Sequence, residues 1–173
     1  DTAISDSFTF KVNDGTVDST AATVGIVITA VNDQPVATPQ TDVAATEQTA
    51  VTITLAGTDA DGDTLTYSIV DAPTSGTATL DGVTVTYTST SDTAISDSFT
   101  FKVNDGTVDS AAATVGIVIT AVNDQPTSSD QTVTTIEDIS LDITLVAADV
   151  DGDTLTYLVV DNPTNGSVSI TEN

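Results

Sequence analysis

The chain contains no cysteine, histidine, arginine, methionine or tryptophan, and Lys11 and Lys102 are its only basic residues. Without cysteine, disulfides, thiol nucleophiles and cysteine-based zinc sites are excluded. Without histidine, the commonest general base and transition-metal ligand is also missing. The 26 acidic residues give a formal charge of −24, which argues against binding to nucleic acid or to an anionic membrane surface.

The acidic residues are nearly all aspartate, because Glu47, Glu137 and Glu172 are the only glutamates. Aspartate favours turns, where it bonds its own backbone or a hard cation. The hydrophobic fraction of 39% is sufficient for folded cores. The sequence has no transmembrane run, so no membrane insertion is expected of this segment, which reads as part of a longer gene product.

Long internal repeats organise the chain. Residues 1–19 recur identically at 92–110, and residues 21–35 recur at 112–126, with Thr20 against Ala111 as the only break. A repeat of roughly 90 residues exceeds the usual solenoid unit and is large enough to be a small domain. We therefore predict three parts: the back of one repeat (1–34), one whole repeat (35–125) and the front of a third (126–173).

Period-2 alternation of apolar residues with threonine predicts strands throughout. Val51, Ile53 and Leu55 alternate with threonines in one such run. The pattern is typical of antiparallel sheets with one buried face, and turn signals separate the runs. We predict an all-β fold of immunoglobulin-like sandwiches, although the Cys…Trp…Cys signature is absent. The clearest strand predictions are 50–57, 64–70, 83–89, 98–103 and 113–122.

Aspartates crowd the stretch GTDADGDTLTYSIVD, residues 57–71, and a shorter copy, ADVDGDTLTYLVVD, occupies residues 148–161. Like charges this close repel one another unless a cation or water separates them. An oxygen-only ligand set favours calcium, magnesium or manganese over zinc or copper. An EF-hand is excluded, because Gly62 precedes the third aspartate and the twelfth position is Val70.

Two longer stretches resemble a known family. TEQTAVTITLAGTDADGDTLTYSIVD resembles the opening half of a cadherin repeat, and FTFKVNDGTVDSAAATVGIVITAVNDQP resembles the closing half, with its Asp-Gly turn and Asn-Asp linker ending in proline. The chain is similar throughout to the cadherin-like tandem repeats of giant bacterial surface proteins, including RTX-type adhesins. This resemblance implies tandem cadherin-like sandwiches joined by short calcium-binding linkers.

The resemblance also implies which residues would bind Ca²⁺ between successive domains. At the junction near residues 32–35, the implied ligands are Asn32, Asp33, Asp59, Asp61 and Asp105, with Asp6 on the preceding side. At the junction near 123–126, they are Glu47, Asp97, Asn123, Asp124, Asp149 and Asp151.

Departures from the cadherin pattern concern three places. SDSF (96–99) stands where cadherins carry a glutamate motif, and AVNDQP lacks one linker carboxylate. Asp63 and Asp153 occupy the family's asparagine position, so we expect them to brace the loop without binding metal. Alternatives without metal stay open. The DADGD and DVDGD loops could be solvated acidic turns, VNDQP a rigid linker closed by proline, and VNDGTVDS an ordinary Asn-Asp-Gly hairpin turn.

The leading functional hypothesis is a spacer: calcium-rigidified extension repeats of a long secreted bacterial surface adhesin, which would mediate cell adhesion or biofilm formation. Its partners would be neighbouring repeats of the same chain. The alternative is an extracellular filament in which identical chains pair by β-strand complementation. We expect no enzyme, because the acid pairs recur in turns of each repeat without an aromatic cleft for sugar.

Overall fold

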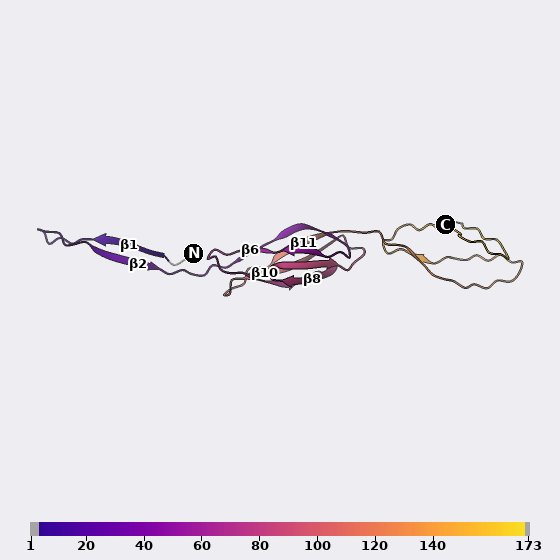
Figure 1. Ribbon diagram of the computed structural model, residues 1–173, viewed down its shortest axis with the longest axis horizontal. Coiled ribbons are helices and arrows are strands. Elements are labelled where there is room, and N and C mark those ends of the chain that lie inside the picture. Colours follow the sequence, from indigo (N-terminus) through magenta and orange to yellow (C-terminus); the bar gives the residue numbers. More distant parts are fainter. Residues whose placement is uncertain (1–3, 172–173) are drawn as a thin grey trace.

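The computed structural model describes residues 4–171. A two-stranded hairpin (indigo), a central domain and a segment containing residues 127–171 (orange to yellow) follow one another along the chain in Figure 1. The described residues form strands and loops, and they include no helix long and apolar enough to cross a membrane. The predicted all-β class is confirmed.

The central domain is a sandwich of two larger sheets, to which a small sheet of two strands, β3 (Val36–Thr38) and β6 (Ala56–Thr58), is added. One sheet has the order β4-β11-β10-β7, in which β4 runs parallel to β11 and the other pairs are antiparallel. Its strands are β4 (Gln40–Thr46), β7 (Thr66–Asp71), β10 (Ser96–Asn104) and β11 (Ala113–Thr120). The antiparallel sheet β5-β9-β8 comprises β5 (Val51–Thr54), β8 (Gly76–Asp81) and β9 (Thr84–Ser89).

Alternating residues of the two sheets meet in one core. Phe99, Phe101 and Val103 of β10 are at most 1% exposed, and they share a cluster with Val85 and Tyr87 of β9. The intervening residues of β10 are only partly buried or exposed, as a period-2 strand with one buried face requires. Burying a side chain of this size stabilises the fold by about 1.5–3 kcal/mol.

The predicted strand 50–57 is two strands that belong to different sheets. β5 pairs with β9, whereas β6 (Ala56–Thr58) pairs with β3 (Val36–Thr38). Leu55 lies between them, 3% exposed, and its N–H donates to the carbonyl of Val83 at 2.8 Å. Buried and exposed side chains continue to alternate from β5 into β6. The sequence pattern therefore does not indicate that the chain changes its partner strand at Leu55.

The two flanking segments repeat parts of this sandwich. The hairpin of β1 (Ile4–Phe10) and β2 (Ala22–Ile28) exposes nearly all its side chains. In the segment 127–171, only β12 (Thr127–Ser128) and β13 (Ala147–Ala148) are strands, and they pair with each other. Neither segment encloses a core like that of the central domain.

Gly76 in β8 tests how tightly this strand packs against its neighbour β9. A Cβ at this position would lie 2.6 Å from the carbonyl oxygen of Thr88 and 2.6 Å from the Tyr87 ring. We predict that Gly76→Ala lowers the free energy of unfolding by about 1–3 kcal/mol, because overpacking must displace backbone and ring. Urea denaturation measures this loss.

The matched control is Gly116→Ala in β11, where the nearest atom would be 3.9 Å away. We expect this variant to be as stable as the parent or slightly more stable, because alanine restricts the unfolded chain. Equal destabilisation by both variants would contradict the packing argument.

Candidate metal centre

The loop after β6 curls around one aspartate. Oδ1 of Asp59 accepts hydrogen bonds from the backbone N–H groups of Asp61 (2.9 Å) and Asp63 (3.1 Å). Gly62 takes a φ of +80°, a conformation that glycine adopts without strain. The curl brings carboxylate oxygens of Asp59, Asp61 and Asp63 within 4.8 Å of one another. Oδ2 of Asp59 is buried and has no hydrogen-bond partner among the described residues.

The linker before the central domain is tied to this loop. The N–H of Asp33 donates to Oδ2 of Asp61 at 2.7 Å, and this bond holds the pKa of Asp61 below its ordinary value. Next to it, Nδ2 of Asn32 donates to Oδ2 of Asp105 at 2.9 Å. Two residues of the linker therefore dock on two separate loops of the domain that follows.

The Asn-Asp-Gly turn, residues 104–106, provides further contacts to the linker. The Asn32 amide, followed by the Val108 N–H, keeps the pKa of Asp105 low, and Asp105 is only 8% exposed. Nε2 of Gln34 donates to the backbone carbonyl of Asp109 at 2.6 Å. The carboxylate of Asp109 pairs with the Lys102 ammonium, which lowers the pKa of Asp109. This side of the junction is held by hydrogen bonds of the chain itself.

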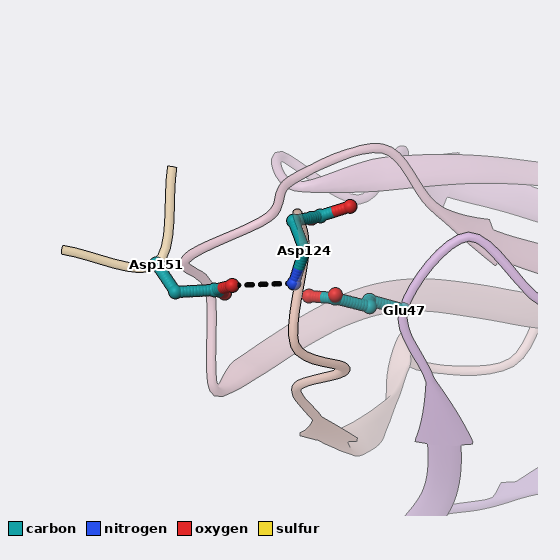
Figure 2. Close-up of side chains that lie close together, drawn as sticks. All are labelled: Glu47, Asp124 and Asp151. Carbon is teal, nitrogen blue, oxygen red and sulfur yellow. Dashed lines mark hydrogen bonds between the residues drawn. The ribbon is translucent and has the colours of Figure 1, made fainter. Parts of the chain in front are cut away.

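The second linker brings three carboxylates from distant positions together, as Figure 2 shows. Glu47 follows β4, Asp124 belongs to the linker, and Asp151 lies in the next acidic loop; their oxygens lie within 4.8 Å of one another. Oε1 of Glu47 accepts from the N–H of Val122 at 2.9 Å. Oδ2 of Asp151 accepts from the N–H of Asp124 at 2.6 Å.

Two oxygens of this cluster have no hydrogen-bond partner within the described part of the chain. They are Oε2 of Glu47, whose residue is only 3% exposed, and Oδ2 of Asp124. A buried carboxylate oxygen without a partner is costly unless a cation or a proton satisfies it. Of the two basic residues in the sequence, Lys102 is already paired with Asp109. The donor set fits a hard divalent cation that binds carboxylate oxygens.

The structure sorts the sequence-predicted ligands into separate groups. Glu47, Asp124 and Asp151 form one cluster, and Asp59 and Asp61 belong to another. Asp33 contacts Asp61 through its backbone, and Asn32 contacts Asp105. Nδ2 of Asn123 donates to the Asp124 carbonyl, and Oδ1 of Asp149 accepts from the Asp153 N–H at 3.2 Å, as Asp59 does from Asp63.

Asp97 lies apart from both clusters and anchors the loop between β7 and β8. Its oxygens accept hydrogen bonds from the N–H groups of Thr74 (3.0 Å) and Ser75 (2.9 Å) and from the Tyr87 hydroxyl (3.0 Å). Burial disfavours the charged form of Asp97, but these bonds and the Ser98 N–H outweigh it, so its pKa lies below the ordinary value. Oδ1 of Asp6, the counterpart of Asp97 in β1, accepts a hydrogen bond from the Ser7 N–H at 2.7 Å.

The N–H of Asp63 braces the acidic loop through Asp59, and its carboxylate also lies in the loop cluster. Sequence reasoning missed two participants, both glutamines. Gln34 holds the linker, and Nε2 of Gln48 donates to Oδ1 of Asp92 at 2.8 Å beside the second junction. The position of Asp97 beside the core could have been found in the sequence. Asp97, Phe99 and Phe101 alternate along β10, so their side chains lie on the same, inward face of the strand.

The comparisons with known proteins identify the family. The chain matches the bacterial Ig domain over residues 32–118 and 123–173, and it therefore belongs to that family. The immunoglobulin-like repeat expected from the sequence is confirmed. No curated protein matches the chain.

Several solved structures resemble the chain at a distance. An endo-fucoidan hydrolase from glycoside hydrolase family 107 is 26% identical over 68% of this chain and 19% of its own, with a TM-score of 0.41. A nucleoside hydrolase-related protein from Saccharophagus degradans is 20% identical over 53% of this chain and 26% of its own (TM-score 0.40). Domains 4 and 5 of the S-layer protein SbsC are 17% identical over 56% and 59% (TM-score 0.34). The chain thus spans about a quarter or less of the first two proteins.

The pair of Tyr87 and Asp97 predicts an alkaline limit of stability. Burial raises the pKa of Tyr87 to about 12 from the ordinary value of 10, and the hydrogen bond to the Asp97 carboxylate adds to this effect. Between pH 10 and about 12, the unfolded chain loses the tyrosine proton while the folded chain keeps it. We therefore expect stability to fall as pH rises through this window.

Urea denaturation at several alkaline pH values measures the slope. Tyr87→Phe should flatten the slope and lower stability at neutral pH by about 1 kcal/mol, because Asp97 loses one donor. Tyr157→Phe, outside the central sandwich, is the matched control and should leave the slope unchanged. A slope that Tyr87→Phe does not alter would rule out this residue as its source.

Proposed function

We propose that these repeats are calcium-stiffened spacers of a long secreted bacterial surface adhesin. The observation that carries the proposal is the buried Oε2 of Glu47, which lies without a hydrogen-bond partner beside Asp124 and Asp151. A bound Ca²⁺ would supply the missing positive charge. Membership of the bacterial Ig domain family and the cadherin-like sequence pattern support the same role.

The origin of the three carboxylates explains how a cation would act mechanically. Glu47 belongs to the central domain, Asp124 to the linker and Asp151 to the following repeat. A cation bound by all three would join two repeats through the segment between them. Without it, their mutual repulsion favours separation of the repeats. Stiffness of the array would then follow the calcium concentration of its surroundings.

Calcium is favoured over other cations by the chemistry of the donors. All candidate ligands are carboxylate, amide or backbone oxygens, and calcium accepts six to eight of them in flexible geometry. Interdomain sites of extracellular modules bind calcium at about 10⁻⁴–10⁻³ M, a range that suits a protein outside the cell. The proposed location is the bacterial cell surface, and the proposed partners are neighbouring repeats of the same chain.

Glu47→Gln tests the site directly. The variant keeps a carbonyl oxygen that can accept from the Val122 N–H but removes one charge from the cluster. In millimolar calcium, we expect the parent to gain about 1.4 kcal/mol at ten times its Kd, and the variant to need at least about tenfold more calcium for the same gain. Thermal unfolding against calcium concentration measures both.

The matched control is Glu137→Gln, the counterpart of Glu47 in the following segment, where the glutamate is exposed. It should titrate like the parent. In a chelator, Glu47→Gln should be at least as stable as the parent, because one like charge has been removed. A purely structural glutamate would instead give equal destabilisation with and without calcium, and that result, or no calcium effect on the parent, would overturn the proposal.

Small-angle scattering tests the mechanical part separately. Calcium should lengthen the largest dimension of the parent and narrow its distribution of shapes, because the two repeats on either side of Asp124 become fixed. If calcium raises the melting temperature but leaves the scattering unchanged, then the site binds the ion without stiffening the array.

A further inference from the structure

The first linker is attached residue by residue to the domain that follows it. Three consecutive residues each donate one hydrogen bond to that domain, at 2.9, 2.7 and 2.6 Å: Asn32 to Asp105, Asp33 to Asp61, and Gln34 to the carbonyl of Asp109. Pro35 comes next, and its side chain is fully buried. Val36 then pairs with Thr58 at the start of β3. From residue 32 onward, the chain is bound to the following domain without a gap.

Two of these three hydrogen bonds end on carboxylates, those of Asp61 and Asp105. Hydrogen bonds between an N–H group and a carboxylate are roughly twice as strong as those between neutral groups. The donors also place the positive ends of N–H dipoles beside crowded acids. Docking of the linker therefore reduces the repulsion among these acids without the help of a cation.

The turn that accepts the bond from Gln34 is itself rigid. Asn104 and Asp109 form a β-bridge, and Nδ2 of Asn104 donates to Oδ1 of Asp109 at 2.7 Å. The Lys102 ammonium pairs with the same carboxylate. The carbonyl of Asp109 is therefore held in place by the domain, so only the Gln34 side chain has to be ordered when the bond forms.

The second linker shows where the attachment changes from one domain to the next. β11 ends at Thr120, and the N–H of Val122 donates backward to Oε1 of Glu47 at 2.9 Å. The N–H of Asp124 donates forward to Oδ2 of Asp151 at 2.6 Å, as Asp33 donates to Asp61 in the first linker. The change takes place within two residues.

The limits of the family match coincide with this change. The bacterial Ig domain matches the chain from residue 32 and again from residue 123, and the first match ends at residue 118. Both starting residues are the linker asparagine, Asn32 and its counterpart Asn123. The family pattern thus groups the linker with the domain that follows it, and this grouping does not depend on the hydrogen bonds.

We propose that residues 32–35 and 123–126 are N-terminal arms, each a fixed part of the repeat that follows it. The arms dock without a cation, because their hydrogen bonds join groups of the chain itself. Asp124 and Asp151 are then brought together on one repeat before any ion binds, and Glu47 is the member of that cluster that the preceding domain contributes. In the absence of an ion, bending falls between Val122 and Asn123.

The two linker glutamines provide a matched pair of variants, because both stand in the sequence VNDQP on opposite sides of the central domain. In excess chelator, Gln34→Ala should lower the melting temperature of the central domain by about 4 °C, because its arm loses one hydrogen bond. Gln125→Ala should leave that temperature unchanged, because Gln125 belongs to the arm of the next repeat. Calorimetry of the full chain measures both.

An arm that belonged to the preceding domain would give the opposite order. A larger loss in Gln125→Ala than in Gln34→Ala, equal losses in both, or a Gln34→Ala variant that melts like the parent would each overturn the proposal.

Amide exchange of Asp33 tests whether the arm docks without a cation. In excess chelator, Asp61→Ala should speed exchange of the Asp33 N–H at least about tenfold, because the amide loses its acceptor. Asp61→Asn should keep the slow exchange, since its amide oxygen can accept the same bond although the charge is gone. Nuclear magnetic resonance of the full chain measures these rates.

Fast exchange of the Asp33 N–H in the parent until calcium is added would show that the arm is not preformed, and the proposal would fail. Loss of slow exchange in Asp61→Asn as well as in Asp61→Ala would also contradict it, because charge rather than the hydrogen bond would then hold the arm. A parent whose melting temperature does not respond to calcium would overturn the calcium-stiffened spacer but not the preformed arm.

Discussion

Repulsion among carboxylates at the linkers is the constraint on which the arrangement of this chain depends. The fold places Glu47, Asp124 and Asp151 within reach of one another, although each comes from a different part of the sequence. The sequence supplies very few positive side chains to balance them. Elsewhere the central domain has an alternating apolar core, threonine-rich outer faces and hydrogen-bonded turns. Among the described residues, the buried carboxylate oxygens without a hydrogen-bond partner lie at the junctions, on Glu47, Asp59 and Asp124.

The layered architecture could be predicted from side-chain periodicity, because alternation in a strand directly reports which face is buried. The partner of each strand could not. Leu55 sits at a change of sheet that periodicity does not register, and β4 pairs parallel with β11 through long-range packing. For Asp97, in contrast, periodicity is informative. It alternates with the buried phenylalanines of β10 and so lies on the core side of the strand, where it accepts a hydrogen bond from Tyr87.

For the candidate site, the spacing of the aspartates indicated that side chains of one loop could converge, and the family resemblance implied which linker residues would lie beside them. Neither indicated how these side chains divide into separate clusters. Nothing in the sequence separates Asp105, whose oxygens are satisfied by Asn32 and its own turn, from Glu47, which keeps one oxygen without a partner. That distinction depends on burial and on where neighbouring N–H groups point. Family analogy gave Asp63 a bracing role, and the curl of the backbone also brings its carboxylate beside those of Asp59 and Asp61, which their close spacing allows.

The two backbone hydrogen bonds of the second linker have a consequence for the whole array. Val122 is held by Glu47 on one side, and Asp124 is held by Asp151 on the other, so Asn123 alone lies between the anchored residues. In the proposed array, bending would then be concentrated in the few backbone torsions around one residue. A string of such repeats would act as a jointed chain of rods, with a statistical segment set by one domain. Its reach at a given tension would depend on how many joints are locked.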